Sequence, residues 1–586
     1  MGGPSYAEAT PIVNVTTFRN YGGSDGVAIH NNADEADVVV VPLMNVVVDG
    51  PDSESAIAPK WRDLPFAILF WAHLAVMIWL GVSVAPKGFE MVHVNLQELE
   101  DQVRKSDDVT EEDIHHLEDI ISEAAIYMEV YPSRIAIFLV IPCCILAFVF
   151  GLIGMNAILK PCPRTMVYTC LISTVVWTVI GLLASAIASG QVFLYVLSGL
   201  SLFGVGYFVR LAWKMVPFAG INLKFALEGI GRNGGIFIVA FLFAVIGFFW
   251  VFYWFYVLIG TFMYQNNRCQ ESHPDENFDM SSDDYSDVCD PPVPVVLFFI
   301  LSLYWTGSIV LNTMQVCVAG VMATFCLDKS DADGCCSPAI WGSLFRSMTY
   351  SFGSICFGSL LQAIAAVLRY LIDSARSKRE QNSDAGACGT VLLCIVGCLA
   401  ELLEDLLRAF NQWAYIFVGL YGFSYIESGK RVMELFQARG FTAIITDNLV
   451  GYVLGFASTI VALATAFTAW LIEHSFSKGK GEPLMEPFDP TVDVNDYSYI
   501  FGPLPMPGLW AAVIGFVIGL WVASVMMNVI KGAINTVIVC WADSPAVMEV
   551  QHPLLTQELS NTYRSVFDLD TMQASGTVPQ STPLIV

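Results

Sequence analysis

The chain has 586 residues, of which 55% are hydrophobic and 14% are charged, and its mean hydropathy is +0.59. Several apolar runs reach the roughly 20 residues that a helix needs to cross a bilayer, which excludes a soluble globular protein. The formal net charge of -26 comes mostly from acids near the ends and in hydrophilic segments, and no basic patch suggests a nucleic-acid partner. We therefore predict an all-α polytopic bundle of about ten transmembrane helices.

The first sixty residues are polar, rich in Gly, Asn and Asp, and without a long apolar run. We predict a disordered tail over 1–60 and a transmembrane domain over 61–541. The first span, 64–84, follows Lys60 and Arg62, and basic residues before a span favour a cytoplasmic start. The N-terminus is therefore predicted to be cytoplasmic.

His73 lies in the middle of this first span. Its ring titrates near neutral pH, and lipid does not tolerate its charged form. It is a candidate for proton coupling, and the alternative is a neutral histidine that hydrogen-bonds to a neighbouring helix.

The acidic segment 86–133, whose apolar residues recur at helical spacing, is predicted to be an outer loop with short helices and without a metal site.

The next four spans are expected at 134–159, 166–188, 191–213 and 236–264. The basic segment 214–235 before the last of them should lie inside. That last span contains Tyr253 and Trp254 within a dense aromatic run. Such rings serve in packing or an interfacial belt, or they form a cage that binds a quaternary ammonium ion by cation-π attraction.

The acidic segment 265–292 is the second predicted outer loop, and it contains Cys269 and Cys289. They are the only two of the 15 cysteines that we place clearly outside, where thiols oxidise. We predict a disulfide between them.

The span at 294–326 carries a polar and aromatic cluster in its middle. Polar groups at membrane depth cost insertion energy, so the cluster should face other helices or a watery path rather than lipid. It is the first candidate for a solute site. Its members are Tyr304, Trp305, Thr306, Gly307, Ser308, Asn312, Thr313 and Gln315.

The remaining spans are expected at 351–373, 391–425, 443–472 and 509–540. Counting spans puts the basic linker 374–387 outside, whereas the positive-inside rule keeps it inside. Either a re-entrant segment lies in this region or long helix ends protrude.

Lys531, in the last span, either snorkels to the inner surface or acts as a counter-ion. The segment 473–507 is the third predicted outer loop, and 542–586 is predicted to be a cytoplasmic tail.

Four stretches carry a family resemblance: LYWTGSIVLNTMQVCVAGVMATFC, SFGSICFGSLLQAIAAVLRYLID, FNQWAYIFVGLYGFSYIESGKRVMELF and ADSPAVMEVQHPLLTQELS. Taken in this order, they resemble the choline transporter-like family. The FGSL motif at 357–360 and the FNQWAYI motif at 410–416 are hard to obtain from membrane composition alone. The resemblance covers roughly 60–560, and the short outer loop 86–133 is similar to the fungal and protist branch.

That resemblance implies about ten spans, cytosolic termini and transport of a small-molecule cation, choline or a related amine. Choline is charged at every pH, so its path needs aromatic faces or carboxylates in place of water, and a partner for its hydroxyl group. We expect a secondary transporter that uses alternating access around a midplane site. The alternative is a channel-like or lipid-associated multi-pass membrane protein without choline transport.

The substrate-binding candidates are the ring side chains Tyr253, Trp254, Tyr304 and Trp305 and the hydroxyl partners Asn312 and Gln315. Gly307 and Gly320 mark places where helices could approach or bend. No nucleophile with a base, phosphate loop or metal signature accompanies the spans, so we expect neither an enzyme nor a cofactor. We expect the plasma membrane as the location, because the disulfide and outer loops suit it, with membrane lipids as partners.

Overall fold

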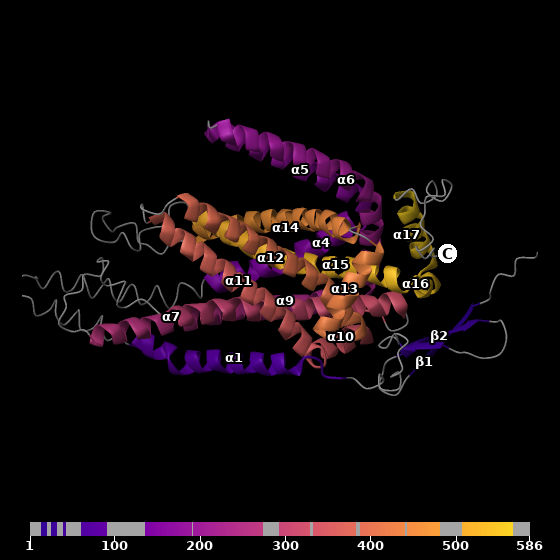
Figure 1. Cartoon of the computed structure of the whole chain (residues 1–586), viewed down its shortest axis with the longest axis horizontal. Coiled ribbons are helices and arrows are strands. Elements are labelled where there is room, and N and C mark those ends of the chain that lie inside the picture. Colours follow the sequence, from indigo (N-terminus) through magenta and orange to yellow (C-terminus); the bar gives the residue numbers. More distant parts are fainter. Residues whose placement is uncertain are drawn as a thin grey trace, which may run out of the picture.

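The structure is a computed structural model, and the residues that it describes are 13–19, 25–31, 39–42, 60–90, 135–189, 192–272, 292–328, 332–381, 387–439, 442–480 and 507–566. Long helices run roughly along one axis and form the body of the molecule (Figure 1). They are α1 (Leu64–Ser83), α4 (Ile141–Gly154), α5 (Pro163–Ser189), α6 (Val192–Arg232), α7 (Ile236–Ser272), α9 (Val293–Leu327), α11 (Phe352–Gln381), α12 (Ala387–Tyr421), α14 (Thr442–Lys480) and α15 (Pro507–Asp543). Two π-helical segments, η2 (Ala136–Val140) and η3 (Met155–Leu159), flank α4.

In the described part of the chain, eight helical segments are long and apolar enough to cross a membrane. They are Leu64–Glu90, Ile137–Ala157, Pro163–Ala184, Ile236–Asn266, Val293–Leu327, Phe352–Ser377, Leu449–Phe476 and Gly508–Asp543. The two other long helices, α6 and α12, have 41 and 35 residues, which is also a sufficient length. A helix satisfies its own backbone hydrogen bonds in lipid, and the prediction of an all-α polytopic bundle is confirmed.

Three short segments of the N-terminal region are extended. Three short strands form an antiparallel sheet in the order β1 (Val13–Arg19), β2 (Asp25–Asn31) and β3 (Val39–Pro42). Val, Thr and Ile are frequent in these segments and favour extended backbone. The residues between and around these strands lie outside the described residues, and the disordered tail over 1–60 stays a prediction.

Several helices are longer than the predicted spans. α6 continues through Pro217 to Arg232, so most of the inside segment predicted at 214–235 is helical. α7 has 37 residues and is about 55 Å long, so its end reaches into the predicted outer loop 265–292. α14 likewise extends into the predicted loop 473–507. The hydrocarbon core is only about 30 Å thick, so such helices protrude from it.

α11 and α12 decide between the two interpretations of the linker at 374–387. They are neighbouring, continuous helices that extend to Gln381 and from Ala387. No re-entrant segment occurs in their described parts, and long helix ends protrude instead. The charged residues that interrupt the span predicted at 391–425 therefore lie within one helix.

α9 occupies the centre of the bundle, where it contacts α7, α10 (Pro338–Met348), α11, α12 and α15. Its second half, from Asn312 to Leu327, is almost entirely buried. α12 approaches it closely, because a Cβ on Gly419 would lie only 2.7 Å from the Val316 carbonyl oxygen. The polar middle of α9 is thus surrounded by other helices.

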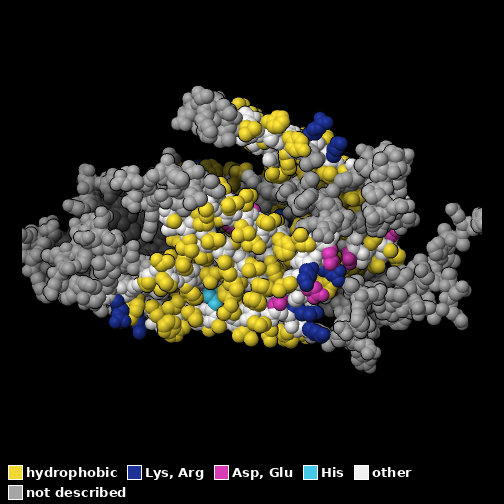
Figure 2. Space-filling model, viewed as in Figure 1, with side chains coloured by type: hydrophobic (Ala, Val, Ile, Leu, Met, Phe, Trp, Pro, Cys, Tyr) yellow, Lys and Arg dark blue, Asp and Glu magenta, His cyan; other side chains and the backbone are white. Residues whose placement is uncertain are grey.

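The surface of the long helices is strongly apolar. Figure 2 shows a broad hydrophobic area over them, with Lys and Arg gathered toward its two ends. Such an apolar band between charged ends is expected for a protein whose helices contact lipid.

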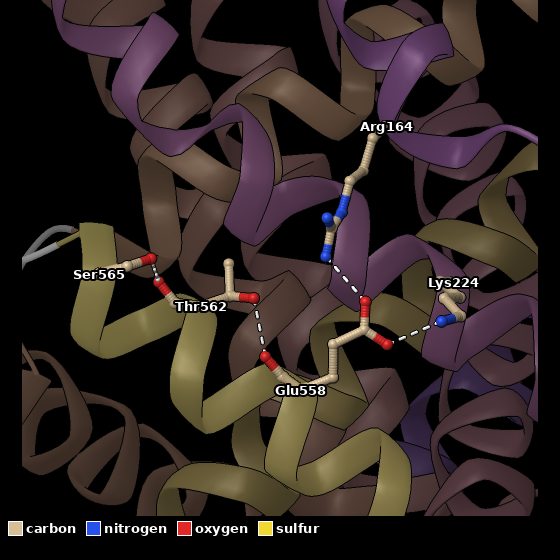
Figure 3. Close-up of polar contacts among 5 residues, drawn as sticks. All are labelled: Arg164, Lys224, Glu558, Thr562 and Ser565. Atoms are coloured by element: carbon tan, nitrogen blue, oxygen red, sulfur yellow. Dashed lines mark hydrogen bonds and ion pairs between the residues drawn. The ribbon is translucent and has the colours of Figure 1, made fainter.

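The segment predicted as a C-terminal tail begins with two packed helices, α16 (Pro545–Gln551) and α17 (Pro553–Val566). Glu558 of α17 accepts hydrogen bonds from Arg164 Nη2 at 2.8 Å and from Lys224 Nζ at 2.7 Å (Figure 3). His552 Nε2 lies 2.7 Å from the Phe325 carbonyl oxygen of α9. Exposed ion pairs contribute about 0–1 kcal/mol each, so the Glu558 contacts fix the position of α17 more than the stability of the protein.

Asp63 joins the starts of three helices at one end of the bundle. Its Oδ2 accepts hydrogen bonds from Ser354 Oγ at 2.7 Å and from the backbone N–H of Tyr425 at 2.8 Å. Ser354 lies at the start of α11, and Tyr425 begins α13 (Tyr425–Arg439). Asp63 has φ of 49°, a left-handed conformation that Asp adopts more readily than most residues other than glycine.

Asp63→Ala is expected to lower the free energy of unfolding by about 1–3 kcal/mol, because Ser354 and the Tyr425 N–H lose their acceptor. Asp63→Asn keeps an oxygen acceptor in place, so its free energy of unfolding should fall by less. Thermal unfolding of the purified protein in detergent measures both changes. An Asp63→Ala protein as stable as the wild type would contradict this role for Asp63.

Candidate functional site

A cavity of about 410 Å³ lies between α7, α9, α11, α12 and α15. Small-molecule sites typically measure about 300–1,000 Å³, so this one is large enough for a small solute. Its polar lining consists of Tyr304, Ser308, Asn312, Gln315, Gln362, Glu404, Arg408, Gln412, Asn528, Lys531 and Asn535. Six of these side chains are carboxamides, which both donate and accept hydrogen bonds.

α9 supplies one wall of the cavity. Tyr304, Ser308, Asn312 and Gln315 follow one another at intervals of three or four residues, which places them on one face of a helix. They lie near the middle of a helix of 35 residues. This part of the polar cluster predicted within 294–326 therefore faces a cavity, whereas Trp305, Thr306 and Thr313 are buried away from it.

Asn312 also belongs to a polar layer that joins α9 to α11 and α12. Its Nδ2 lies 2.9 Å from Ser359 Oγ, 3.0 Å from Gln362 Oε1 and 3.3 Å from Tyr415 Oη. Its two hydrogens are shared among these three acceptors. A buried network of this kind favours one arrangement of helices when all its members are satisfied, so Asn312 both lines the cavity and positions its wall.

Gln315 connects α9 to α12 at the edge of the cavity. Its Nε2 donates to the Gln412 carbonyl oxygen at 2.9 Å. Gly532 of α15 lies beside it, since a Cβ there would be 3.9 Å from Gln315 Cγ. Toward the C-terminal ends of α9 and α12, the two helices then pack directly at Gly419. The cavity is therefore narrowed at this end.

The charged part of the lining is organised around Glu404 of α12, whose side chain is only 13% exposed. Its Oε2 accepts from Arg369 Nη1 at 3.2 Å, and its Oε1 accepts from Arg408 Nη2 at 2.9 Å. Two basic residues, Arg408 and Lys531, and one acidic residue, Glu404, line the cavity. Their formal charges therefore leave the lining slightly positive.

The α12 part of this site was not predicted. Glu404, Arg408 and Gln412 are spaced by four residues, which places them on one helix face. The sequence interpretation treated the charges in this span as a problem of topology. Their regular spacing was the signal that could have identified a polar face within the membrane.

Three of the six predicted substrate-binding residues lie away from the cavity. Tyr253 Oη donates to the Met77 carbonyl oxygen at 3.0 Å, and Trp254 Nε1 donates to that of Phe299 at 2.9 Å. Trp305 Nε1 donates to the Cys356 carbonyl oxygen at 3.1 Å. Their polar atoms bond to neighbouring helices and their rings pack in apolar clusters, so the structure does not bring these three rings together with Tyr304 at the cavity. Tyr304, Asn312 and Gln315 do line the cavity.

His73 lies in an aromatic environment outside the cavity. Its ring centroid is 5.2 Å from that of Trp305 and 5.6 Å from that of Phe298. Neither ring nitrogen has a hydrogen-bond partner in the described part of the chain. The hydrogen bond to a neighbouring helix that we considered is therefore absent there, and proton coupling through His73 stays a prediction.

The disulfide prediction lies partly outside the described residues. Cys269 is near the end of α7, and Cys289 is in the segment 273–291, which the structure does not describe.

Within the described ranges, no group of three or more His, Cys, Asp and Glu residues could hold a metal ion.

Comparison of the Trp305→Ala and Gln315→Ala variants should distinguish a residue that packs the bundle from one that contacts the solute. Trp305 is 2% exposed, so its truncation should lower the free energy of unfolding by about 3–5 kcal/mol and reduce protein abundance. Gln315→Ala should reduce uptake of the transported solute at normal abundance, because it changes the cavity wall. Immunoblotting and uptake assays on the same membranes measure both quantities. Normal abundance of Trp305→Ala would contradict its structural role.

Comparison with known proteins connects this site to a family. The family model described as plasma-membrane choline transporter matches residues 192–546, which include every helix that lines the cavity. α1 lies outside the matched region.

The curated relatives are fungal proteins named Protein PNS1. The protein from Mycosarcoma maydis is 32% identical over 274 residues, 47% of this chain and 47% of that protein. The protein from Yarrowia lipolytica is 32% identical over 273 residues, 46% of this chain and 43% of that protein. The protein from Kluyveromyces lactis is 25% identical over 536 residues, 89% of this chain and 84% of that protein. The chain thus spans about half the length of the first two relatives and most of the third.

Proposed function

This chain belongs to the choline transporter-like family, and from that membership we propose that it is a secondary transporter of choline or a related amine. Family membership and the multi-span helical bundle support a membrane transporter. The observation that carries the proposal is the polar cavity between family-matched helices at membrane depth. We propose that the solute binds there.

An amine in this cavity would meet Tyr304, six carboxamides and Glu404. The ring of Tyr304 offers a face for a quaternary ammonium group, and Asn312 or Gln315 would hydrogen-bond to the choline hydroxyl group. Glu404 is shared by Arg369 and Arg408. The ammonium group therefore gains most from this carboxylate when Arg408 moves away from it.

Alternating access would require the narrow end of the cavity to open. The contacts that hold it are the Gln315 bond to α12 and the close packing at Gly419. Beyond them, the Tyr421 hydroxyl donates to Asp543 and so joins α12 to α15. We propose that these contacts separate when the solute is released on that side, while the opposite end closes.

We further propose that this narrow end faces the cytoplasm and that both termini lie on that side. Arg164, Lys224 and Arg232 lie at this end of the bundle, near α17 and the segment after α9, and basic residues favour the cytoplasmic side.

The plasma membrane is the proposed location. Membrane lipids are the proposed surroundings of the bundle, and the proposed role is transport without enzymatic activity.

One observation favours the second candidate function, a channel-like or lipid-associated multi-pass protein without choline transport. Basic side chains outnumber acidic ones in the cavity lining, which does not favour a bare cation. Saturable uptake that is accelerated by solute on the opposite side would distinguish a transporter from a channel or a lipid-associated protein.

The test is uptake of labelled choline by proteoliposomes that contain the purified full-length chain, with ethanolamine and thiamine as competitors. We expect saturable uptake that depends on the protein and is faster when unlabelled choline is present inside. Liposomes without protein are the control. Labelled ethanolamine and labelled thiamine are then tested in the same way, and absence of protein-dependent uptake of all three amines would overturn the proposed function.

A further inference from the structure

Two adjacent cysteines, Cys335 and Cys336, are exposed in the segment between α9 and α10. Most of the other free cysteines in the described ranges are buried or half-buried in helices. Only Cys162 and Cys398 are also exposed among them. A pair of exposed thiols next to a membrane domain therefore calls for a chemical explanation.

Hydrogen bonds hold this cysteine segment firmly against the turn between α6 and α7. Asn233 Nδ2 donates to the Ala332 carbonyl oxygen at 3.0 Å, and Ser337 Oγ donates to Asn233 Oδ1 at 2.7 Å. The Gly334 N–H donates to the Arg232 carbonyl oxygen at 3.0 Å. The two thiols thus have a defined place at the end of the bundle.

α10 begins two residues after Cys336 and has two contrasting faces. Ser343 packs against α9, because a Cβ on Gly320 would lie 2.6 Å from Ser343 Oγ. The opposite face carries Trp341, Phe345 and Met348, which are 60%, 59% and 55% exposed. Their spacing of four and three residues forms one continuous apolar stripe.

The apolar stripe of α10 lies at the level where α1 enters the membrane. Tyr350, just after α10, has its ring centroid 6.1 Å from that of Phe345 and 5.5 Å from that of Trp61. The Arg62 N–H donates to the Tyr350 carbonyl oxygen at 3.1 Å. Aromatic side chains beside basic residues at the start of a span are typical of the membrane interface. These contacts and the exposed apolar stripe are the features expected of a helix that lies along the membrane interface with its apolar face toward lipid.

We propose that Cys335 and Cys336 are a site of S-acylation by a long-chain fatty acid, presented to the inner leaflet by α10. The exposed thiols lie directly before an interfacial helix, so an acyl chain attached to them can enter the same leaflet as Trp341 and Phe345. An attached acyl chain adds membrane affinity with each CH₂ group that it buries in the leaflet. The proposal is independent of which solute the protein carries.

The reaction transfers the acyl group from the thioester of coenzyme A to a cysteine thiol, which becomes a new thioester. The cysteine sulfur attacks the thioester carbonyl carbon of a long-chain acyl-coenzyme A. A new carbon–sulfur bond forms as the bond to coenzyme A breaks, and the coenzyme A thiolate takes up the proton that the cysteine loses. Acyl-coenzyme A is cytosolic, which matches the cytoplasmic side proposed for this end of the bundle.

The test uses the full-length protein in yeast membranes. Free thiols are blocked with N-ethylmaleimide, thioesters are cleaved with hydroxylamine, and the released thiols are labelled with a maleimide polymer that shifts the protein on a gel. We expect hydroxylamine-dependent labelling of the wild type and about a tenfold loss in the Cys335→Ser/Cys336→Ser double variant. Peptide mass spectrometry should find the acyl group on the 335–336 peptide.

Cys162→Ser is the matched control, because Cys162 is also exposed but is not followed by α10, and it should keep the label. Trp341→Ser/Phe345→Ser keeps both thiols and removes the apolar stripe, so labelling should fall there too. Immunoblotting and gel filtration establish that each variant is folded. No hydroxylamine-dependent label on the wild type, or full labelling of the double cysteine variant, would overturn the proposal. Full labelling of the Trp341→Ser/Phe345→Ser protein would overturn the role of α10.

Discussion

Glu404→Gln is expected to reduce amine uptake about tenfold or more, which corresponds to a loss of about 1.4 kcal/mol or more in binding the cation. Among the lining residues that the structure describes, Glu404 is the one carboxylate. The amide removes its charge while Arg408 and Lys531 remain, so the only formal charges that line the cavity near a desolvated cation would be positive. The amide also accepts weaker hydrogen bonds from Arg369 and Arg408 than a carboxylate does. Proteoliposome uptake of labelled choline, normalised to reconstituted protein, measures the change.

Glu401→Gln is the matched control for this experiment. Glu401 is on the same helix, and its Oε1 lies 3.7 Å from Arg369 Nη2, but its side chain is 58% exposed and does not line the cavity. We expect near-normal uptake by this variant, because an exposed ion pair contributes little. An equal loss in both variants would indicate a general effect of the charge on α12. Normal uptake by a folded Glu404→Gln protein would remove Glu404 from the solute site.

The spans could be predicted because lipid imposes strict limits on length and composition. A segment such as 294–326 is recognisable from its apolar residues alone, and its polar middle predicts contact with other helices. The ends of the helices were harder to predict than their apolar middles. The basic residues of 214–235 suggested an inside segment after the span at 191–213, yet α6 continues through Pro217 to Arg232, because helices continue beyond the membrane where neighbouring helices stabilise them.

The candidate site could be predicted only in part, because helix rotation and partners are set by packing. Tyr304 and Trp305 are neighbours in the sequence, yet one lines the cavity and the other donates to a carbonyl oxygen of α11. The spacing of four residues pairs Glu404 with Arg408, but its second partner, Arg369, lies on another helix 35 positions earlier and could not be inferred from the sequence. A charge in an apolar span looks unfavourable until the residue that compensates it is known.

Gly353→Ala is expected to reduce the amount of folded protein strongly, because the added methyl group has no room between α1 and α11. A Cβ at Gly353 would lie 2.2 Å from the Arg62 carbonyl oxygen and 2.5 Å from that of Asp63. Both atoms belong to the main chain, so α1 or α11 must shift, and the Asp63 bonds to Ser354 and to the Tyr425 N–H are lost with that shift. Overpacking and lost hydrogen bonds together should cost about 3 kcal/mol or more.

Gly307→Ala is the control for this effect, because nothing lies within 4 Å of a Cβ built at Gly307 in the middle of α9. Alanine there should be tolerated or should slightly stabilise the helix, by about 0.5–1 kcal/mol. Fluorescence size-exclusion chromatography and thermal unfolding in detergent compare the two proteins. Gly353→Ala protein with wild-type abundance and stability would contradict the close packing of α1 on α11. If Gly307→Ala instead lost uptake at full stability, bending of α9 at Gly307 would be part of the transport cycle.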